Sequence, residues 1–311
     1  MTEISIVVPV RNEEESIKPF LERTVKVLDN IGKEYEIIFS LDPSTDKTEK
    51  IIQEEIQKNK NIKLLVFSRQ FGQPAATMAG IFNCKGSYCV IIDVDLQDPP
   101  ELIEQMYEKI ITGYEVIYAK RRSRKGETFF KKIISSLGYF LINKLSDIKI
   151  PRDTGDYRII SRKIINQLKD LNESHGFLRG MVAFVGYNQS FVEYDRNERL
   201  AGKSKYNKFF GSLRIGLNGL IGFSSRPLFL MAITGFIIAL ISFLLGLWYL
   251  FQKISGINLT AGLTTTVILI SFFAGIQLLG LGLLGEYVGR IYDEVKKRPK
   301  YILEKKINFD K

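Results

Sequence analysis

The chain has 311 residues, of which 45% are hydrophobic and 25% are charged, and its mean hydropathy is +0.01. Its 44 Lys and Arg residues against 34 Asp and Glu residues give a net charge of +10. The 21 Phe and 14 Tyr residues exclude a disordered chain, because that much apolar surface can offset the entropy lost on folding. The averages alone describe a soluble protein, but the apolar residues are unevenly distributed.

Short apolar runs alternate with helical patterns in the first part of the chain. We expect strands at residues 4–10, 35–41, 62–68, 88–94 and 115–119, and helices at residues 13–31, 46–58, 73–83 and 99–112. This alternation is typical of β-α-β units, which build a mostly parallel sheet. Because such sheets bind ligands at the carboxyl ends of their strands, the loops at those ends are the first place to look for a site.

The pattern is less regular after residue 121. Residues 129–145 read as helical, and residues 153–158 form a polar, turn-rich passage. Between residues 203 and 225, aromatic and aliphatic residues alternate with Lys and Arg. This alternation predicts one or two amphipathic helices lying on a membrane surface, with an ordinary core-packing helix as the alternative.

Two segments near the C-terminus are long and apolar. Residues 228–251 and 263–285 contain no charged side chain, and each is longer than the roughly 20 residues needed to cross a bilayer. Basic residues cluster on both outer flanks, whereas the connection at 252–262 holds only Lys253. We therefore expect two transmembrane helices with both flanks, and both chain termini, in the cytoplasm.

The chain thus divides into four expected parts. They are a cytosolic α/β domain at residues 1–202, interfacial amphipathic helices at 203–226, two transmembrane helices within 227–288 and a basic cytosolic tail at 289–311. Glycines in the two spans permit close helix packing, within one chain or between copies. Glu286 and Arg290 are spaced for an i,i+4 ion pair at the end of the second span.

The reactive side chains narrow the possible chemistry. The single histidine, His175, excludes a multi-histidine metal site and most Ser-His-Asp catalysis, which leaves carboxylates as the metal ligands. Two cysteines, Cys84 and Cys89, are too few for a disulfide framework, so we expect reduced, structural thiols.

An acidic turn follows the fourth expected strand. Asp93 and Asp95 end this apolar run, and strand alternation points them to one side of the sheet. Such a pair suits a hard divalent cation, Mg²⁺ or Mn²⁺, that itself holds a diphosphate. Arg11 and Glu13 follow the first strand and Asp42 follows the second, so polar groups gather at three strand ends. Helix capping remains an alternative role for Ser44 and Asp46.

Several stretches of the chain resemble a known family. VVPVRNEEES, LDPSTDKT, DVDLQDPPELI, DTGDYR and GEYVGRIYDEVKKRPKYI are similar to motifs of the family 2 glycosyltransferases that load a sugar onto a polyprenyl phosphate. The bactoprenol glucosyltransferase branch is the nearest, and dolichyl-phosphate mannose synthases are related. The resemblance runs from Ile4 to about Ile302 and implies a nucleotide-diphospho-sugar transferase (GT-A-like) fold for the α/β domain.

The resemblance also implies roles for individual residues. The implied metal ligands are Asp93, Asp95 and Gln97, and the implied nucleotide-sugar contacts are Pro9, Arg11, Glu13, Asp42 and Asp93. The implied contacts to the acceptor phosphate are Arg121, Arg124, Arg199, Ser204 and Lys205. The implied catalytic carboxylates are Asp156 and Asp95. Leu41 and Pro43 depart from the family's D-D-G-S pattern, at positions that the resemblance links to base or ribose recognition. Phe184 stands where the family has Trp.

The implied activity is inverting, metal-dependent transfer of a sugar, with glucose from UDP-glucose as the leading candidate, to undecaprenyl phosphate. The reaction would take place at the cytoplasmic face of the plasma (inner) membrane and supply a lipid-linked sugar for modifying cell-envelope glycans. The chain would act as a homo-oligomer, a dimer or tetramer, and would not bind nucleic acid. Two rival hypotheses remain: a non-catalytic membrane scaffold or flippase partner, and a processive polysaccharide synthase, which would need further spans and a Q-x-x-R-W-like motif.

Overall fold

The computed structural model describes residues 2–122, 154–171, 173, 178–195, 221–222, 224–255 and 262–309. Its strands are β1 (Ile4–Val10), β2 (Tyr35–Leu41), β3 (Ile62–Phe67), β4 (Tyr88–Ile91), β5 (Val116–Arg121), β6 (Thr154–Ser161), β7 (Gln189–Tyr194) and β8 (Leu303–Ile307). Its helices are α1 (Ile17–Ile31), α2 (Thr48–Lys58), α3 (Gln73–Asn83), α4 (Leu102–Ile110), α6 (Arg162–Leu171), α7 (Leu178–Val185), α9 (Arg226–Ile254) and α10 (Leu263–Lys296).

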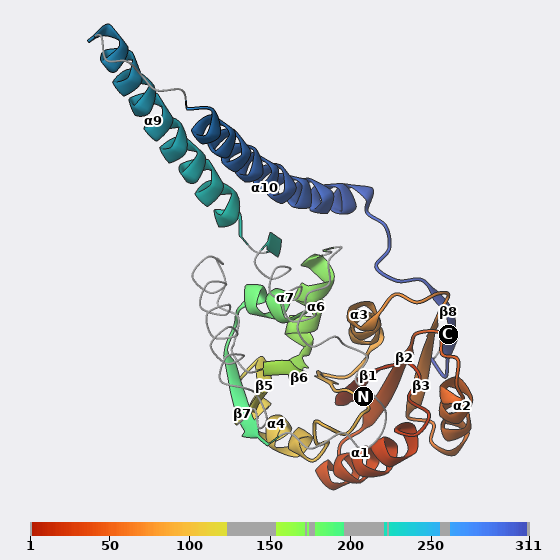
Figure 1. The fold of residues 1–311 in the computed structure, drawn as a ribbon. Helices are drawn as coiled ribbons and strands as arrows, with labels where there is room; N and C mark the ends of the chain where they lie inside the picture. The colour runs from red at the N-terminus through yellow and green to blue at the C-terminus, as the bar shows by residue number, and fades with distance from the viewer. Residues whose placement is uncertain are drawn as a thin grey trace.

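All eight strands belong to one mixed sheet with the order β7-β5-β6-β4-β1-β2-β3-β8. β1 to β4 run parallel to one another, and β7 runs parallel to β5. β6 is antiparallel to β4 and β5, and β8 is antiparallel to β3. Helices α1, α2 and α4 cover one face and α3, α6 and α7 cover the other (Figure 1). The expected α/β architecture with a mostly parallel sheet is therefore confirmed.

The central strands are buried on both faces. Side chains of β1 alternate between the two cores, so that Ile6 and Val8 meet α1 and α4 while Val7 meets α3. Gly80 allows α3 to approach the sheet closely, because a Cβ at this position would overlap the Val7 side chain. Cys84 and Cys89 are buried in the same core as free cysteines.

Pro9 lies inside β1, a central strand where proline is uncommon. The hydrogen bonds from β4 to β1 end where Ile92 donates its N–H to the Val7 carbonyl at 3.1 Å. Backbone N–H and C=O groups two residues apart in a strand point to the same neighbouring strand. The nitrogen of Pro9 therefore faces the side of β4, at a level where β4 has already left the sheet. Its missing N–H thus removes no ladder bond, and β1 opens toward the acidic turn that follows β4.

The sequence-based prediction of a turn-rich passage at residues 153–158 is wrong, because β6 occupies this region between β4 and β5. The polar residues of this region show no alternation of apolar and polar side chains that would predict a strand. Arg158 is fully buried; its guanidinium donates to the Gly155 carbonyl at 2.8 Å and lies over the Tyr118 ring, 5.1 Å from its centroid. Tyr157 is buried on the opposite face.

The end of the chain returns to the sheet instead of forming only a basic tail. α10 continues to Lys296, beyond the expected end of the second span, and β8 then pairs with the edge strand β3. Tyr301 packs edge-on against Phe67 with ring centroids 5.8 Å apart. Three consecutive charged residues lie between Leu303 and Ile307, so β8 has no apolar alternation, and its pairing partner lies far away in sequence; the sequence analysis therefore missed this strand.

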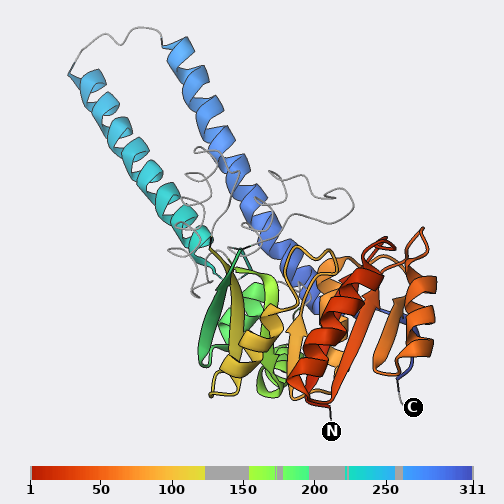
Figure 2. The same ribbon diagram turned by 90° about the horizontal axis from the view of Figure 1, so that it is seen from below.

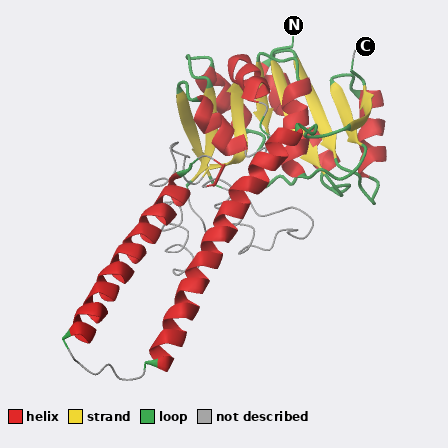
Figure 3. Ribbon diagram, turned by 90° about the horizontal axis from the view of Figure 1, so that it is seen from above, coloured by secondary structure: helices red, strands yellow, loops and turns green. Residues whose placement is uncertain are grey.

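Two long apolar helices, α9 and α10, project away from the α/β domain (Figures 2 and 3). Stretches of 23 and 25 residues within them are long and apolar enough to cross a membrane, and large side chains such as Phe236 and Leu279 are exposed along them. Gly280 packs against Met231 of the other helix, since a Cβ there would lie 2.5 Å from Met231 Cε. The expected Glu286–Arg290 ion pair forms at 3.3 Å. Most of the expected interfacial segment, 203–226, lies outside the described residues.

Candidate active site

The acidic turn after β4 is anchored by its apolar residues. Val94 and Leu96 are buried in the core on the α4 side, whereas Asp93 lies toward α3, where its Oδ1 accepts a hydrogen bond from Gln73 Nε2. Leu96 has a φ of 57°, in the left-handed region, and Asp95 Oδ1 accepts a hydrogen bond from the Gln97 N–H at 3.2 Å. The turn therefore fixes both carboxylates at the carboxyl edge of the sheet.

The beginning of α3 is held between two strand ends. Asp42, only 3% exposed at the end of β2, accepts hydrogen bonds from the Phe71 and Gly72 N–H groups at 3.0 and 2.8 Å. Gln73, the first residue of α3, donates from Nε2 to Asp93 Oδ1 at 2.8 Å. Asp42 thus orders the loop before α3, and this helix links Asp42 to Asp93 across the intervening strand.

Hydrogen bonds connect the loops that follow β1 and β2. The Asn12 N–H donates to Ser44 Oγ at 3.0 Å, and Asn12 Oδ1 accepts from the Thr45 N–H at 2.8 Å. The Glu13 N–H donates to Thr48 Oγ1 at 2.9 Å. This network keeps residues 13–16 and 46–47 in turns, so α1 and α2 begin later than the sequence predicts. The N-cap of α2 is Lys47, without a side-chain cap, although Asp46 Oδ1 accepts a hydrogen bond from the Thr48 N–H at 3.0 Å.

Asp156 lies on β6 beside two arginines. Its Oδ1 accepts a hydrogen bond from Arg179 Nε of α7 at 2.8 Å and lies 3.5 Å from Arg158 Nη2. Burial alone would raise the pKa of this carboxyl, but the charges of Arg179, Arg158 and Arg121 outweigh it and hold the pKa below its ordinary value. Asp156 is therefore ionised at neutral pH.

Arg121 ends β5 at the same edge of the sheet. Its Nη2 lies 3.8 Å from Asp98 Oδ1, and its Nε donates to the Tyr194 hydroxyl at 3.3 Å. Arg121 also lowers the pKa of Asp156, so these basic and acidic groups share one region of the sheet edge. Asp98, in turn, follows the acidic turn that carries Asp93 and Asp95.

Comparisons with known proteins identify the family. The sequence profile described as "Glycosyl transferase family 2" matches residues 5–169. An uncharacterised glycosyltransferase of Bacillus subtilis, YkcC, is 44% identical over 97% of this chain and 93% of its own length. The chain belongs to glycosyl transferase family 2. The expected family is thereby confirmed, and the protein is a glycosyltransferase.

Other relatives of this family 2 glycosyltransferase have more specific names. A bactoprenol glucosyl transferase from the SfII prophage of Shigella flexneri is 40% identical over 97% of both chains. A solved mycobacterial protein of similar fold has a TM-score of 0.50 and 16% identity, with 71% of this chain and 73% of that chain covered. The structural likeness supports the α/β fold alone.

The structure of this glycosyltransferase brings together most of the predicted site residues that it describes. Asp42, Asp93, Asp95, Gln97, Arg121 and Asp156 gather at one sheet edge, with buried Pro9 and with Arg11 and Glu13 on the loop that follows β1. Arg124, Arg199, Ser204 and Lys205 lie outside the described residues. Sequence reasoning missed Asp98, Arg158, Arg179 and Tyr194, whose contacts depend on strand pairing and on α7.

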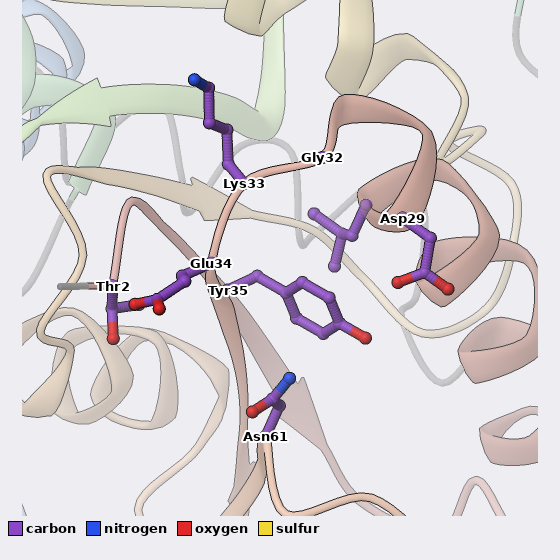
Figure 4. Close-up of a pocket in the computed structure, with 8 residues that line it drawn as sticks. Thr2, Asp29, Gly32, Lys33, Glu34, Tyr35 and Asn61 are labelled. Carbon is purple, nitrogen blue, oxygen red and sulfur yellow. The ribbon is translucent and has the colours of Figure 1, made fainter.

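A hollow at the opposite edge is not part of this site. It is lined by the end of α1 and by residues at the amino ends of β1, β2 and β3, namely Thr2, Leu28, Asp29, Gly32, Lys33, Glu34, Tyr35 and Asn61 (Figure 4). None of the predicted site residues lines it. Parallel α/β sheets bind ligands at the other ends of their strands, so this hollow has no place in the catalytic chemistry.

Proposed function

We propose that this glycosyltransferase transfers a hexose from a nucleotide-sugar to the phosphate of a polyprenyl carrier in the membrane. The observation that carries the proposal is the placement of Arg121 and the Asp156–Arg179 pair beside the acidic turn, in a chain with two exposed apolar helices. The names of relatives such as the SfII bactoprenol glucosyl transferase support a lipid acceptor. Glucose from UDP-glucose is the leading donor.

The donor would bind across the loops that follow β1, β2 and β4. Arg11 and Glu13 lie next to Asn12, whose contacts to Ser44 and Thr45 fix the first two loops relative to each other. Asp42 would serve the nucleotide indirectly, because both of its carboxylate oxygens already accept backbone N–H groups at the start of α3. Its role is thus to shape the wall of the nucleotide site.

The acidic turn fits a divalent metal that is shared with the donor. Among the described residues, no group of three or more His, Cys, Asp or Glu side chains is placed to hold a metal. Mg²⁺ and Mn²⁺, however, accept one or two protein carboxylates when a substrate diphosphate provides further oxygens. Asp93 and Asp95, with Gln97, would hold the ion. When bound, it would offset the charge of the departing diphosphate.

The remaining task of the protein is to align the acceptor. A phosphate monoester has a second pKa near ~6 and is mostly ionised at neutral pH, so its oxygen can attack the anomeric carbon without a strong base. The attack forms the new bond to oxygen, expels the nucleoside diphosphate and inverts the anomeric configuration. Asp156, held ionised by Arg179 and Arg158, orients the guanidinium groups that receive the acceptor phosphate.

Membrane attachment follows from the acceptor, because its isoprenoid tail stays in the bilayer while its phosphate lies at the surface. α9 and α10 would span the bilayer and keep the sheet edge near the lipid headgroups. The basic residues on both flanks of this pair favour a cytoplasmic catalytic domain, where nucleotide-sugars are made. Exposed glycines of the spans, among them Gly246 and Gly275, would allow copies to pack as a dimer or tetramer.

Transfer of label from a nucleotide-sugar into a lipid extract tests the proposal. A panel of UDP- and GDP-sugars is incubated with the purified full-length protein and polyprenyl phosphate, with Mg²⁺ or Mn²⁺ or with a chelator. We expect one sugar to be transferred, and transfer to stop with the chelator. No labelled lipid from any sugar would contradict the proposal, and a labelled polymer would favour a processive synthase.

A further inference from the structure

Hydrogen bonds of the buried Tyr194 side chain join β7 to β5, through Arg121, and to the residue after the acidic turn, Asp98. Tyr194, the last residue of β7, donates a hydrogen bond from its hydroxyl to Asp98 Oδ1 and accepts one from Arg121 Nε at 3.3 Å. Arg121 Nη2 lies 3.8 Å from the same Asp98 oxygen. Tyr194 and Asp98 are only 6% and 3% exposed. These polar contacts therefore form away from bulk water, where they are stronger.

The surroundings leave the Arg121 guanidinium little freedom. A Cβ at Gly155 on the neighbouring β6 would lie 3.1 Å from Arg121 Nη2, so this arginine fits over the strand because residue 155 has no side chain. Tyr157 packs edge-on against Tyr194 with ring centroids 6.2 Å apart, and its hydroxyl donates to the Pro99 carbonyl at 2.9 Å. The Tyr157 ring thus restricts the Tyr194 ring, while the Tyr194 hydroxyl is held by Asp98 and Arg121.

The same contacts connect the proposed metal site in the acidic turn with the proposed site for the acceptor phosphate. Asp98 follows the metal-binding turn, Arg121 ends β5, and Tyr194 directly precedes the segment that contains Arg199 and Lys205. Burial and the neighbouring Asp98 raise the pKa of Tyr194, so its hydroxyl keeps the proton that it donates. A guanidinium that is held by an acidic partner at one end presents its remaining N–H groups in a fixed direction.

We propose that Tyr194 and Asp98 are positioning residues that hold the Arg121 guanidinium where it receives the acceptor phosphate. This inference rests on the proposed transfer to a lipid phosphate. Neither residue contacts the acceptor itself; both act through Arg121. Asp98 orients the fork of the guanidinium, and the Tyr194 hydroxyl fixes its Nε edge. Loss of either contact should therefore weaken binding of the acceptor and leave binding of the nucleotide-sugar unchanged.

The variant Tyr194→Phe removes one hydroxyl and keeps the buried ring. Steady-state kinetics of the full-length protein should show a KM for polyprenyl phosphate raised about tenfold, with the KM for the nucleotide-sugar unchanged. Tyr157→Phe is the matched control, because it removes a hydroxyl from the same ring pair without touching Arg121. An unchanged acceptor KM in Tyr194→Phe, or an equal rise in Tyr157→Phe, overturns the inference.

Calorimetric titration separates this inference from the proposed function. The probes are a short-chain prenyl phosphate and UDP, added to the wild type, Tyr194→Phe and Asp98→Asn. Both variants should bind the prenyl phosphate about tenfold more weakly and UDP equally well. If the wild type binds the prenyl phosphate more tightly than both variants but transfers no sugar to it, the proposed function fails while the positioning role stands. If the wild type transfers sugar but both variants bind the prenyl phosphate as tightly as the wild type, the inference fails. It also fails if both variants lose UDP binding. Should Tyr194→Phe not fold, Asp98→Asn decides by the same criterion.

Discussion

Arg179 on α7 donates a hydrogen bond from Nε to Asp156 Oδ1 on β6 across 2.8 Å. This contact joins a helix and a strand that are separated in sequence by α6, and it places a second guanidinium near Arg121. Because Asp156 also lies 3.5 Å from Arg158 Nη2, its charge is balanced by more than one arginine. Asp156 is therefore better suited to organising cationic groups than to accepting a proton.

Replacing Arg179 by glutamine should lower sugar transfer at least about tenfold, because Asp156 loses the guanidinium that pairs with it and the site loses one positive charge. The protein should remain folded, since the Arg179 side chain is 25% exposed. Lys163→Gln is the control: Lys163 pairs with Glu115 at 3.6 Å on the surface, where an ion pair contributes little. Equal activities of the two variants in the lipid-extraction assay would argue against a role for Arg179.

The pH dependence of stability should report the ionised state of Asp156. Its pKa lies below the ordinary value of 3.8 in the folded protein, so its charged form stabilises the fold above that value, and the contribution is lost as the pH falls through the folded pKa. The melting temperature of Asp156→Asn should therefore lie below that of the wild type by a constant amount between about pH 5 and 8. A difference that instead changes across neutral pH would mean that Asp156 titrates there.

Asp42→Asn should destabilise the loop before α3. An amide keeps one acceptor oxygen but faces the second backbone N–H with its own N–H groups, so the free energy of unfolding should fall by about 1–3 kcal/mol. Chemical denaturation measures this loss. Asp29→Asn, at an exposed position on α1, should leave the stability unchanged. If both variants are as stable as the wild type, the Asp42 contacts do not order this loop.

Tyr301→Ala should weaken the attachment of the C-terminal strand. The partly buried ring packs against Phe67 and the core on the α3 side, so its loss should cost about 1–3 kcal/mol and expose the β3 edge to aggregation. Thermal melting with light scattering detects both effects. Tyr292→Ala, which removes an exposed ring from α10, is the control and should melt like the wild type. Identical melting of the two variants would show that β8 does not support the sheet.

The parts of the fold with local signals were predicted well from the sequence. The bounds of β1, β2 and α3 agree with the structure because apolar runs and helix periodicity are properties of a short segment. β6 and β8 were missed because their stability comes from pairing with distant strands. The buried Arg158 supports β6, and Tyr301 supports β8.

The same distinction applies to the site. Asp93 and Asp95 could be predicted because they follow a buried strand directly, and the alternation of Val94 and Leu96 into the core is visible in the sequence. Arg179 and Tyr194 could not, since neither belongs to a local motif. Their roles arise only when α7 and β7 are placed beside β6 and β5.

The most direct test measures labelled sugar transferred from the nucleotide-sugar to polyprenyl phosphate by the wild type, Asp95→Asn and Asp170→Asn. Asp95 lies in the acidic turn, whereas Asp170 is an exposed carboxylate on α6 and controls for the loss of one charge. We predict full transfer by the wild type and Asp170→Asn, and transfer reduced at least about a hundredfold in Asp95→Asn, because one of the two carboxylates proposed to hold the metal is lost. Transfer by Asp95→Asn at the wild-type rate, or no transfer by the wild type, would contradict metal-assisted glycosyl transfer to a lipid phosphate at this sheet edge.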